Sequence, residues 1–153
     1  MSVLSSMIDK AFIQLNVKAT DWQDAIKVSA QPLLKAGKIA ESYIEKMIDI
    51  ALETGPYIVI AKNVALPHAP PDAGVYQTAM SITVLEHDVH FGNPDNDPVK
   101  YLFCLSATDS NSHLEALAEL VDLLEDQNFF QLLNQARNRT EVLDYVINKT
   151  KNR

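Results

Sequence analysis

Two histidines stand where the sequence changes from apolar runs to polar segments. His68 lies in "NVALPHAPPDAG", residues 63–74, whose three prolines stiffen the backbone on both sides of the imidazole. His113 follows the apolar run 101–105 and opens an amphipathic stretch. If the strands before the two histidines are neighbours that run in the same direction, the two rings meet at the carboxyl edge of the sheet. A plain surface histidine, or a helix-capping one, is an equally good interpretation of each position taken alone.

A pair of imidazoles beside a helix start suits phosphoryl transfer. One ring can accept the group as a nucleophile while the other stabilises its charge. The first backbone N–H groups of the expected helix, residues 112–115, would favour an anion at the same place. A serine hydrolase is disfavoured, because no G-x-S-x-G nucleophile elbow is present.

The remaining polar clusters favour solvated turns over metal sites. His87 and His90 have a His-x-x-His spacing, but a strand period points them to different faces and no third ligand is evident. The acidic residues Asp88, Asp95 and Asp97 lack the spacing of a calcium loop. We therefore expect no metal.

Neither a cysteine nucleophile nor a nucleotide cofactor is expected. Cys104 lies within an apolar strand, where a thiol is most simply a small buried hydrophobe. The chain has four glycines and no glycine-rich phosphate loop.

The composition fits one globular domain over residues 1–153. The chain has 153 residues, of which 47% are hydrophobic, and a formal net charge of −7, which disfavours nucleic-acid binding and leaves room for a basic protein partner. A single cysteine fits a reducing compartment. Without a signal-peptide pattern or a long apolar run, the expected location is the cytoplasm.

The element pattern predicts a single-domain α/β sandwich with a mixed sheet of about four to five strands flanked by helices. Capping boxes at Thr20/Gln23 and Ser42/Glu45 open two helices, and Pro32 should kink or shorten the first. Residues 56–61 and 63–66 are expected to form two short strands or one bent strand, and further strands are expected at 76–85 and 101–105, with brief pairing possible at 89–91. The later helices are expected at 112–126, 128–136 and 140–150.

Several of these segments resemble a known family. The block "ETGPYIVIAKNVALPHA" and the later "SHLEALAEL" are similar to the enzyme IIA components of the bacterial sugar phosphotransferase system (PTS), in the mannitol/fructose-type superfamily. The ascorbate-specific subgroup is the most similar, through "TDWQDAIKVS", "GPYIVIA", "DNDPV" and "TEVLDYV". The resemblance covers nearly the whole chain, which would then be one PTS EIIA type-2-like domain.

The resemblance implies a phosphocarrier. His68 would accept a phosphoryl group from phospho-HPr, by family precedent on Nε2, and pass it to a cysteine of enzyme IIB. Enzyme IIB in turn serves the membrane component IIC, for L-ascorbate or a related sugar acid. His113 would orient or stabilise the group, and no cofactor is implied.

The sequence departs from the family in its cations. Ascorbate-type relatives carry arginine where Pro70 stands, and the helix segment "IDIALETG" lacks the arginine of mannitol-type relatives. Stabilisation of the phosphoryl charge would then fall to backbone N–H groups, to His113 and to hydroxyls such as those of Ser106, Thr108 and Ser112. The alternatives to a phosphocarrier are a regulatory module that signals by its phosphorylation state and a degenerate interaction domain. Retention of both histidines speaks against the second.

Overall fold

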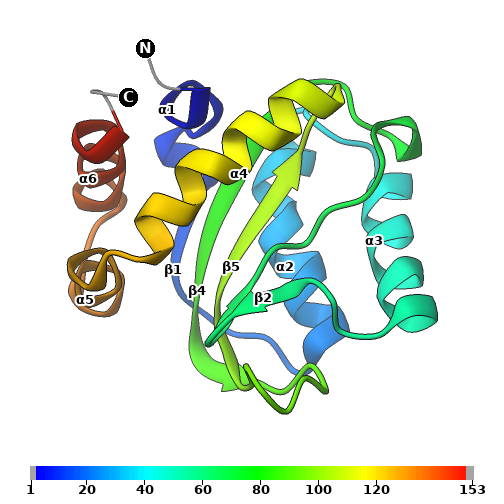
Figure 1. Cartoon of the computed structure of the whole chain (residues 1–153), viewed down its shortest axis with the longest axis horizontal. Helices are drawn as coiled ribbons and strands as arrows, with labels where there is room; N and C mark the ends of the chain where they lie inside the picture. Colours follow the sequence, from blue (N-terminus) through cyan, green and yellow to red (C-terminus); the bar gives the residue numbers. More distant parts are fainter. Residues whose placement is uncertain (1–2, 151–153) are drawn as a thin grey trace.

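The computed structural model describes residues 3–150 and has helices on both faces of a five-stranded mixed sheet (Figure 1). This confirms the predicted α/β fold. The strands are β1 (Ile13–Val17), β2 (Val59–Ala61), β3 (Val64–Ala65), β4 (Ala79–Val89) and β5 (Val99–Ser106). The helices are α1 (Val3–Met7), α2 (Trp22–Lys35), α3 (Glu41–Thr54), α4 (Ser110–Leu124), α5 (Gln127–Gln135) and α6 (Arg139–Thr150), with 3-10 turns η1 (Lys10–Phe12) and η2 (Pro71–Ala73). Of the helices described, none is long and apolar enough to cross a membrane.

The strand order β1-β4-β5-β3-β2 makes β3 and β5 neighbours. They run parallel, with Val64 opposite Tyr101 and Ala65 opposite Leu102. The segments that follow these two strands therefore leave the sheet at the same edge. The condition under which His68 and His113 should meet is confirmed.

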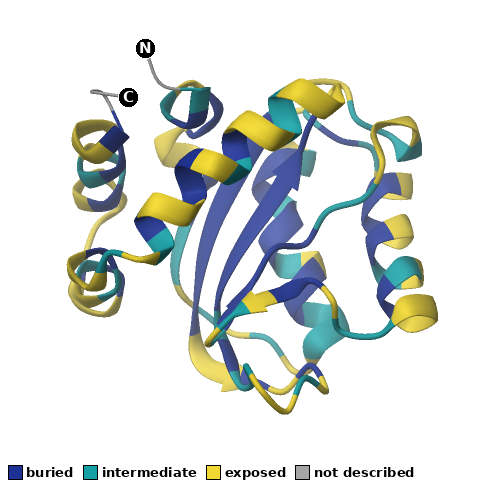
Figure 2. Cartoon of the chain, viewed as in Figure 1, coloured by how far each residue is buried: buried dark blue, intermediate teal, exposed yellow. Residues whose placement is uncertain are grey.

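Two hydrophobic cores share the sheet, one on each face. Along β5, Tyr101, Phe103 and Leu105 pack on the side of α1, α4, α5 and α6, whereas Leu102 and Cys104 pack on the side of α2 and α3. This alternation is that of a strand covered on both faces, as the apolar run predicts. Figure 2 shows the resulting dark blue centre between the half-exposed helices.

Both predicted capping boxes are wrong. In α2 the N-cap is Asp21, whose carboxylate accepts from the backbone N–H of Asp24 at 2.8 Å. In α3 the N-cap is Ala40, without a side-chain cap. The hydroxyl of Ser42 donates instead to the carbonyl of Ala73, at 2.9 Å. A tertiary contact thus takes the group that local spacing assigned to capping.

Helix α2 passes through Pro32 and ends three residues later. A proline lacks the N–H that would bind the carbonyl four residues earlier. Here that carbonyl belongs to Val28, and it accepts from Nε2 of Gln14 on β1 at 2.9 Å. The next carbonyl, that of Ser29, accepts from the Ser81 hydroxyl at 2.6 Å. The sheet therefore supplies a donor that the proline removes.

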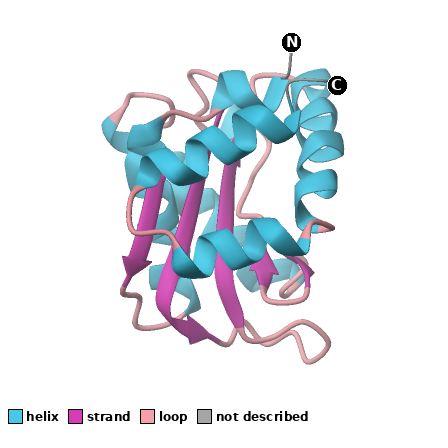
Figure 3. Ribbon diagram, turned by 90° about the vertical axis from the view of Figure 1, so that its left-hand side faces the viewer, coloured by secondary structure: helices cyan, strands magenta, loops and turns pink. Residues whose placement is uncertain are grey.

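Other element boundaries differ from the sequence pattern. The predicted strand 76–85 starts later and continues to Val89, which pairs with Val99. Helix α4 begins at Ser110 instead of residue 112. The pattern did not predict α1 or β1, and β1 adds a parallel edge strand beside β4. In Figure 3 the strands face the viewer, with helices in front of them and other helices behind them.

Candidate functional site

Hydrogen bonds to two parts of the sheet fix the segment that carries His68. Just after β3, the N–H of Leu66 donates to the carbonyl of Ile58 at 2.7 Å. The carbonyl of Pro67 accepts from the N–H of Leu105 at 3.0 Å. The two residues before the histidine are buried, while His68 itself is half-buried. The backbone that carries the imidazole is therefore held in place at the edge of the sheet.

A backbone contact determines the tautomer of His68. Its Nδ1 lies 2.7 Å from the carbonyl oxygen of Leu66. Because a carbonyl can only accept, Nδ1 must carry the proton in this contact. The neutral ring then has its lone pair on Nε2. That lone pair is the one chemically free to act as a nucleophile.

His113 lies in the first turn of α4, next to His68. The N-cap Asp109 accepts from the N–H of Ser112 at 2.7 Å, and its carbonyl accepts from the N–H of His113 at 3.2 Å. The ring centroids of His68 and His113 are 5.3 Å apart, with 46° between the ring planes. Partial burial, and secondly the proximity of His68, lower the pKa of His113 from its ordinary value. The structure brings the two predicted histidines together.

Both rings line one open, largely apolar pocket of about 560 Å³. Two of its side chains are unusually exposed for their size, Tyr57 at 79% and Leu114 at 63%. Its other residues are Ile50, Thr54, Ile58, Ala69, Pro70, Pro71, Ala107, Asp109 and Ser110. None of these is lysine or arginine, so the pocket itself provides no permanently charged cation for an anion.

The three hydroxyl residues proposed for the phosphate do not line this pocket. Ser106 is fully buried and its hydroxyl donates to the carbonyl of Gln77 at 2.9 Å. The hydroxyl of Thr108 lies 3.1 Å from that of Thr78. Two serine or threonine residues do line the pocket, Thr54 and Ser110. The Thr54 hydroxyl donates to the carbonyl of Ile50 at 2.7 Å within its own helix. Sequence reasoning missed Ser110 because it started the helix two residues too late. Aspartate at 109 as an N-cap was the available signal.

The other chemical candidates are occupied or inert. His90 is exposed, with Nδ1 3.8 Å from Asp97. Asp97 accepts from the backbone N–H groups of residues 91, 92 and 93, which is the turn expected for this acidic segment. Within residues 3–150, no three His, Cys, Asp or Glu side chains gather as metal ligands. Burial raises the pKa of Cys104 to about 12, so its thiol is not a ready nucleophile.

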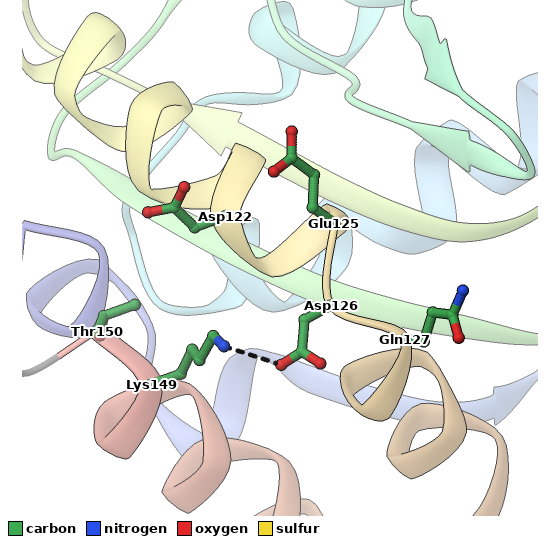
Figure 4. A pocket seen from close by; sticks show the side chains of 6 residues that line it. All are labelled: Asp122, Glu125, Asp126, Gln127, Lys149 and Thr150. Atoms are coloured by element: carbon green, nitrogen blue, oxygen red, sulfur yellow. Dashed lines mark ion pairs between the residues drawn. The ribbon is translucent and has the colours of Figure 1, made fainter.

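A second pocket, between α4 and α6, is unsuited to a phosphoryl group (Figure 4). Its lining includes Asp122, Glu125 and Asp126. Its one cation, Lys149, already pairs with Asp126 at 3.4 Å. An incoming anion would be repelled by these carboxylates.

Comparison with known proteins gives the same family from sequence and from structure. The family model "Phosphoenolpyruvate-dependent sugar phosphotransferase system, EIIA 2" matches residues 6–149. The ascorbate-specific PTS system EIIA component of Escherichia coli (strain K12) is 35% identical over 147 residues, which are 95% of this chain and 96% of that protein.

Two solved structures from Escherichia coli have the same fold. The mannitol-specific cryptic phosphotransferase enzyme IIA CmtB is 38% identical, with a TM-score of 0.82 over 94% of this chain and 97% of CmtB. A complex of enzyme IIA of the mannitol system with phosphorylated enzyme IIB is 23% identical, with a TM-score of 0.79 over 92% of this chain and 97% of the matched chain. At that identity the second likeness concerns the fold alone.

Proposed function

The chain belongs to the phosphoenolpyruvate-dependent sugar phosphotransferase system EIIA 2 family, and from this premise we propose that it is a phosphocarrier that bears the phosphoryl group on His68. The observation that carries the proposal is the contact of His68 Nδ1 with the Leu66 carbonyl, in a ring 5.3 Å from that of His113. This contact leaves Nε2 as the reactive nitrogen.

Loading is a displacement at phosphorus. The lone pair on Nε2 of His68 forms an N–P bond while the N–P bond of phospho-HPr breaks, and the electron pair returns to the HPr ring. The His68 ring then carries positive charge, shared with Nδ1–H, which donates to the Leu66 carbonyl at 2.7 Å. That carbonyl dipole favours the charged ring, and His113 stabilises the phosphoryl oxygens.

Unloading is the same displacement by a different nucleophile. A cysteine thiolate of enzyme IIB attacks phosphorus, an S–P bond forms, and Nε2 of His68 leaves with its electron pair. Membership of the phosphotransferase system EIIA 2 family supports enzyme IIB as the acceptor partner. Membrane component IIC takes part only through enzyme IIB.

The sugar proposed is L-ascorbate or a related sugar acid. The support is the 35% identity to the ascorbate-specific component, over nearly the full length of both chains. CmtB, which is assigned to mannitol, is similarly close in sequence. A carrier that hands its group to another protein never touches the sugar, so the pocket does not discriminate between these two.

In this proposal His113 and Ser110 stabilise the phosphoryl group. Both line the pocket with His68. We assign no contact with the phosphoryl group to Ser106 and Thr108, because their hydroxyls bond to Gln77 and Thr78.

The test is phosphorylation with phosphoenolpyruvate, enzyme I and HPr, followed by intact-mass analysis. The wild type should gain one acid-labile phosphoryl group and lose it when enzyme IIB is added. His68→Ala should gain none, and His87→Ala, which removes an exposed histidine outside the pocket, should behave as the wild type. A wild type that gains no phosphoryl group would overturn the proposal in favour of a degenerate interaction domain. Loading without discharge to enzyme IIB would favour the regulatory module.

A further inference from the structure

The first turn of α3 holds the far end of the proline-rich segment that follows His68. The N–H of Ala40 donates to the carbonyl of Gly74 at 2.8 Å, and the Ser42 hydroxyl donates to that of Ala73 at 2.9 Å. Gly74 has φ +129°, and a Cβ there would lie 2.7 Å from Ser42 Oγ. The approach is so close that only glycine fits.

The same turn reaches the near end of the segment through Tyr43, which is completely buried. Its hydroxyl accepts from the N–H of Ala69 at 2.9 Å and donates to the carbonyl of Leu105 at 2.7 Å. The carbonyl of Ala69 lies 3.1 Å from the same oxygen. Burial raises the pKa of the hydroxyl, so its proton remains available to Leu105 at all ordinary pH values.

These bonds tie both neighbours of His68 to one strand residue. The N–H of Leu105 donates to the carbonyl of Pro67, and its own carbonyl accepts a hydrogen bond from the Tyr43 hydroxyl. The same hydroxyl accepts from the N–H of Ala69. Leu105 belongs to β5, the strand that leads to α4 and His113. The hydroxyl therefore couples the backbone on either side of His68 to the element that positions the second histidine.

We propose that Tyr43 is a positioning residue for phosphoryl transfer, whose buried hydroxyl holds segment 66–69 so that Nδ1 of His68 stays on the Leu66 carbonyl and its ring stays beside His113. The role of Tyr43 in phosphoryl transfer rests on the proposed function. Its effect on the His68 tautomer and on segment 66–69 does not.

The test compares Tyr43→Phe with Tyr101→Phe. Tyr101→Phe is the control, because it too removes a hydrogen-bonded tyrosine hydroxyl. That hydroxyl bonds to Asn134 at 2.6 Å and lies on the α5 side of the sheet. We expect the Ala69 amide of Tyr43→Phe to exchange its hydrogen at least tenfold faster than in the wild type, relative to the Phe103 amide. By ¹⁵N NMR, His68 should shift from the Nδ1–H tautomer toward a mixture, and loading from phospho-HPr should slow at least tenfold. Tyr101→Phe should change none of these relative measures.

If the Ala69 amide of Tyr43→Phe exchanges as slowly as in the wild type and His68 keeps its Nδ1–H tautomer, the inference is overturned, whatever the transfer rate. If Tyr43→Phe does not fold, the wild type still decides: a protected Ala69 amide with an Nδ1–H tautomer supports the inference, and an amide that exchanges as a free loop amide overturns it. If the wild type cannot be loaded, the proposed function fails. The exchange and tautomer measurements still test whether Tyr43 holds segment 66–69.

Discussion

At the scale of single residues, the site is unusual because no arginine or lysine lines it. A phosphoryl dianion on His68 would have His113 as its nearest ionisable partner, while Asp109 at the pocket wall adds like charge. Before loading, partial burial and then His68 lower the pKa of His113, so the ring is neutral near pH 7. After loading, His113 lies next to the negative charge of the phosphoryl group instead of the unmodified His68 ring.

We therefore predict that phosphorylation of His68 raises the pKa of His113. Between the unloaded pKa and the raised pKa of His113, loading takes up a proton. In that range the equilibrium should shift toward the phosphorylated form as pH falls, and below both pKa values the shift should level off. An NMR titration of the His113 ring protons in the loaded and unloaded protein measures both values. An unchanged or lower pKa in the loaded protein would show that His113 does not compensate the phosphoryl charge.

The buried hydroxyl of Ser106 gives a second prediction at this scale. It donates to the carbonyls of Gln77 and Ala79, at 2.9 and 3.3 Å. Ser106→Ala should lower the free energy of unfolding by about 1 kcal/mol, the usual net worth of such a bond. Because the hydroxyl is outside the pocket, loading of the folded variant should stay within about twofold of the wild type. Urea unfolding measures the stability of the variant, and the loading assay measures its phosphorylation. A large loss of loading at unchanged stability would mean that the Ser106 hydroxyl does contact the phosphoryl group.

At the scale of elements, helix α2 depends on the strand that lies beside it. Pro32 leaves the Val28 carbonyl without its helical donor, and Gln14 of β1 supplies one. Gln14 also donates to the hydroxyl of Thr83 on β4, at 3.0 Å. The edge strand and helix α2 therefore stabilise each other through one side chain.

Gln14→Leu should lower the free energy of unfolding by about 1–2 kcal/mol, because a partly buried carbonyl loses its hydrogen-bond donor. In a Pro32→Ala background the helix regains an N–H for Val28, so the same change should cost about 1 kcal/mol less. Urea unfolding of the four proteins gives this coupling. Equal costs in both backgrounds would mean that Gln14 acts only through Thr83.

Local patterns were sufficient for the long amphipathic helices, the central strand and the histidine pair. They failed where a polar side chain found a distant partner. Ser42 looks like part of a capping box, but its hydroxyl binds Ala73, 31 residues away. Helix α1 is held by the carboxylate of Glu119, which accepts from the N–H of Val3 at 2.9 Å. Neither contact leaves a periodic signal. Ser110 was missed for a different reason, because the start of α4 was placed two residues too late.

At the scale of the whole molecule, the His68 pocket opens on a surface with exposed apolar side chains. Tyr57 precedes β2 and Leu114 follows His113 in α4, so the two come from different elements and line one pocket. Large exposed side chains that gather around a reactive group are typical of a protein-docking surface. Tyr76 is similarly exposed, at 65%, but is outside the pocket, which makes it a matched control.

If this rim docks the phosphoryl donor, its loss should affect a protein donor and spare a small one. We expect Tyr57→Ser and Leu114→Ser each to slow loading from phospho-HPr at least tenfold, because each removes apolar contact area from the complex. Loading by phosphoramidate, which needs only access to His68, should stay within about twofold. Tyr76→Ser should leave both rates unchanged. Equal slowing with both donors would mean that these side chains shape the histidine pair itself, and unchanged rates with phospho-HPr would place the docking surface elsewhere on the molecule.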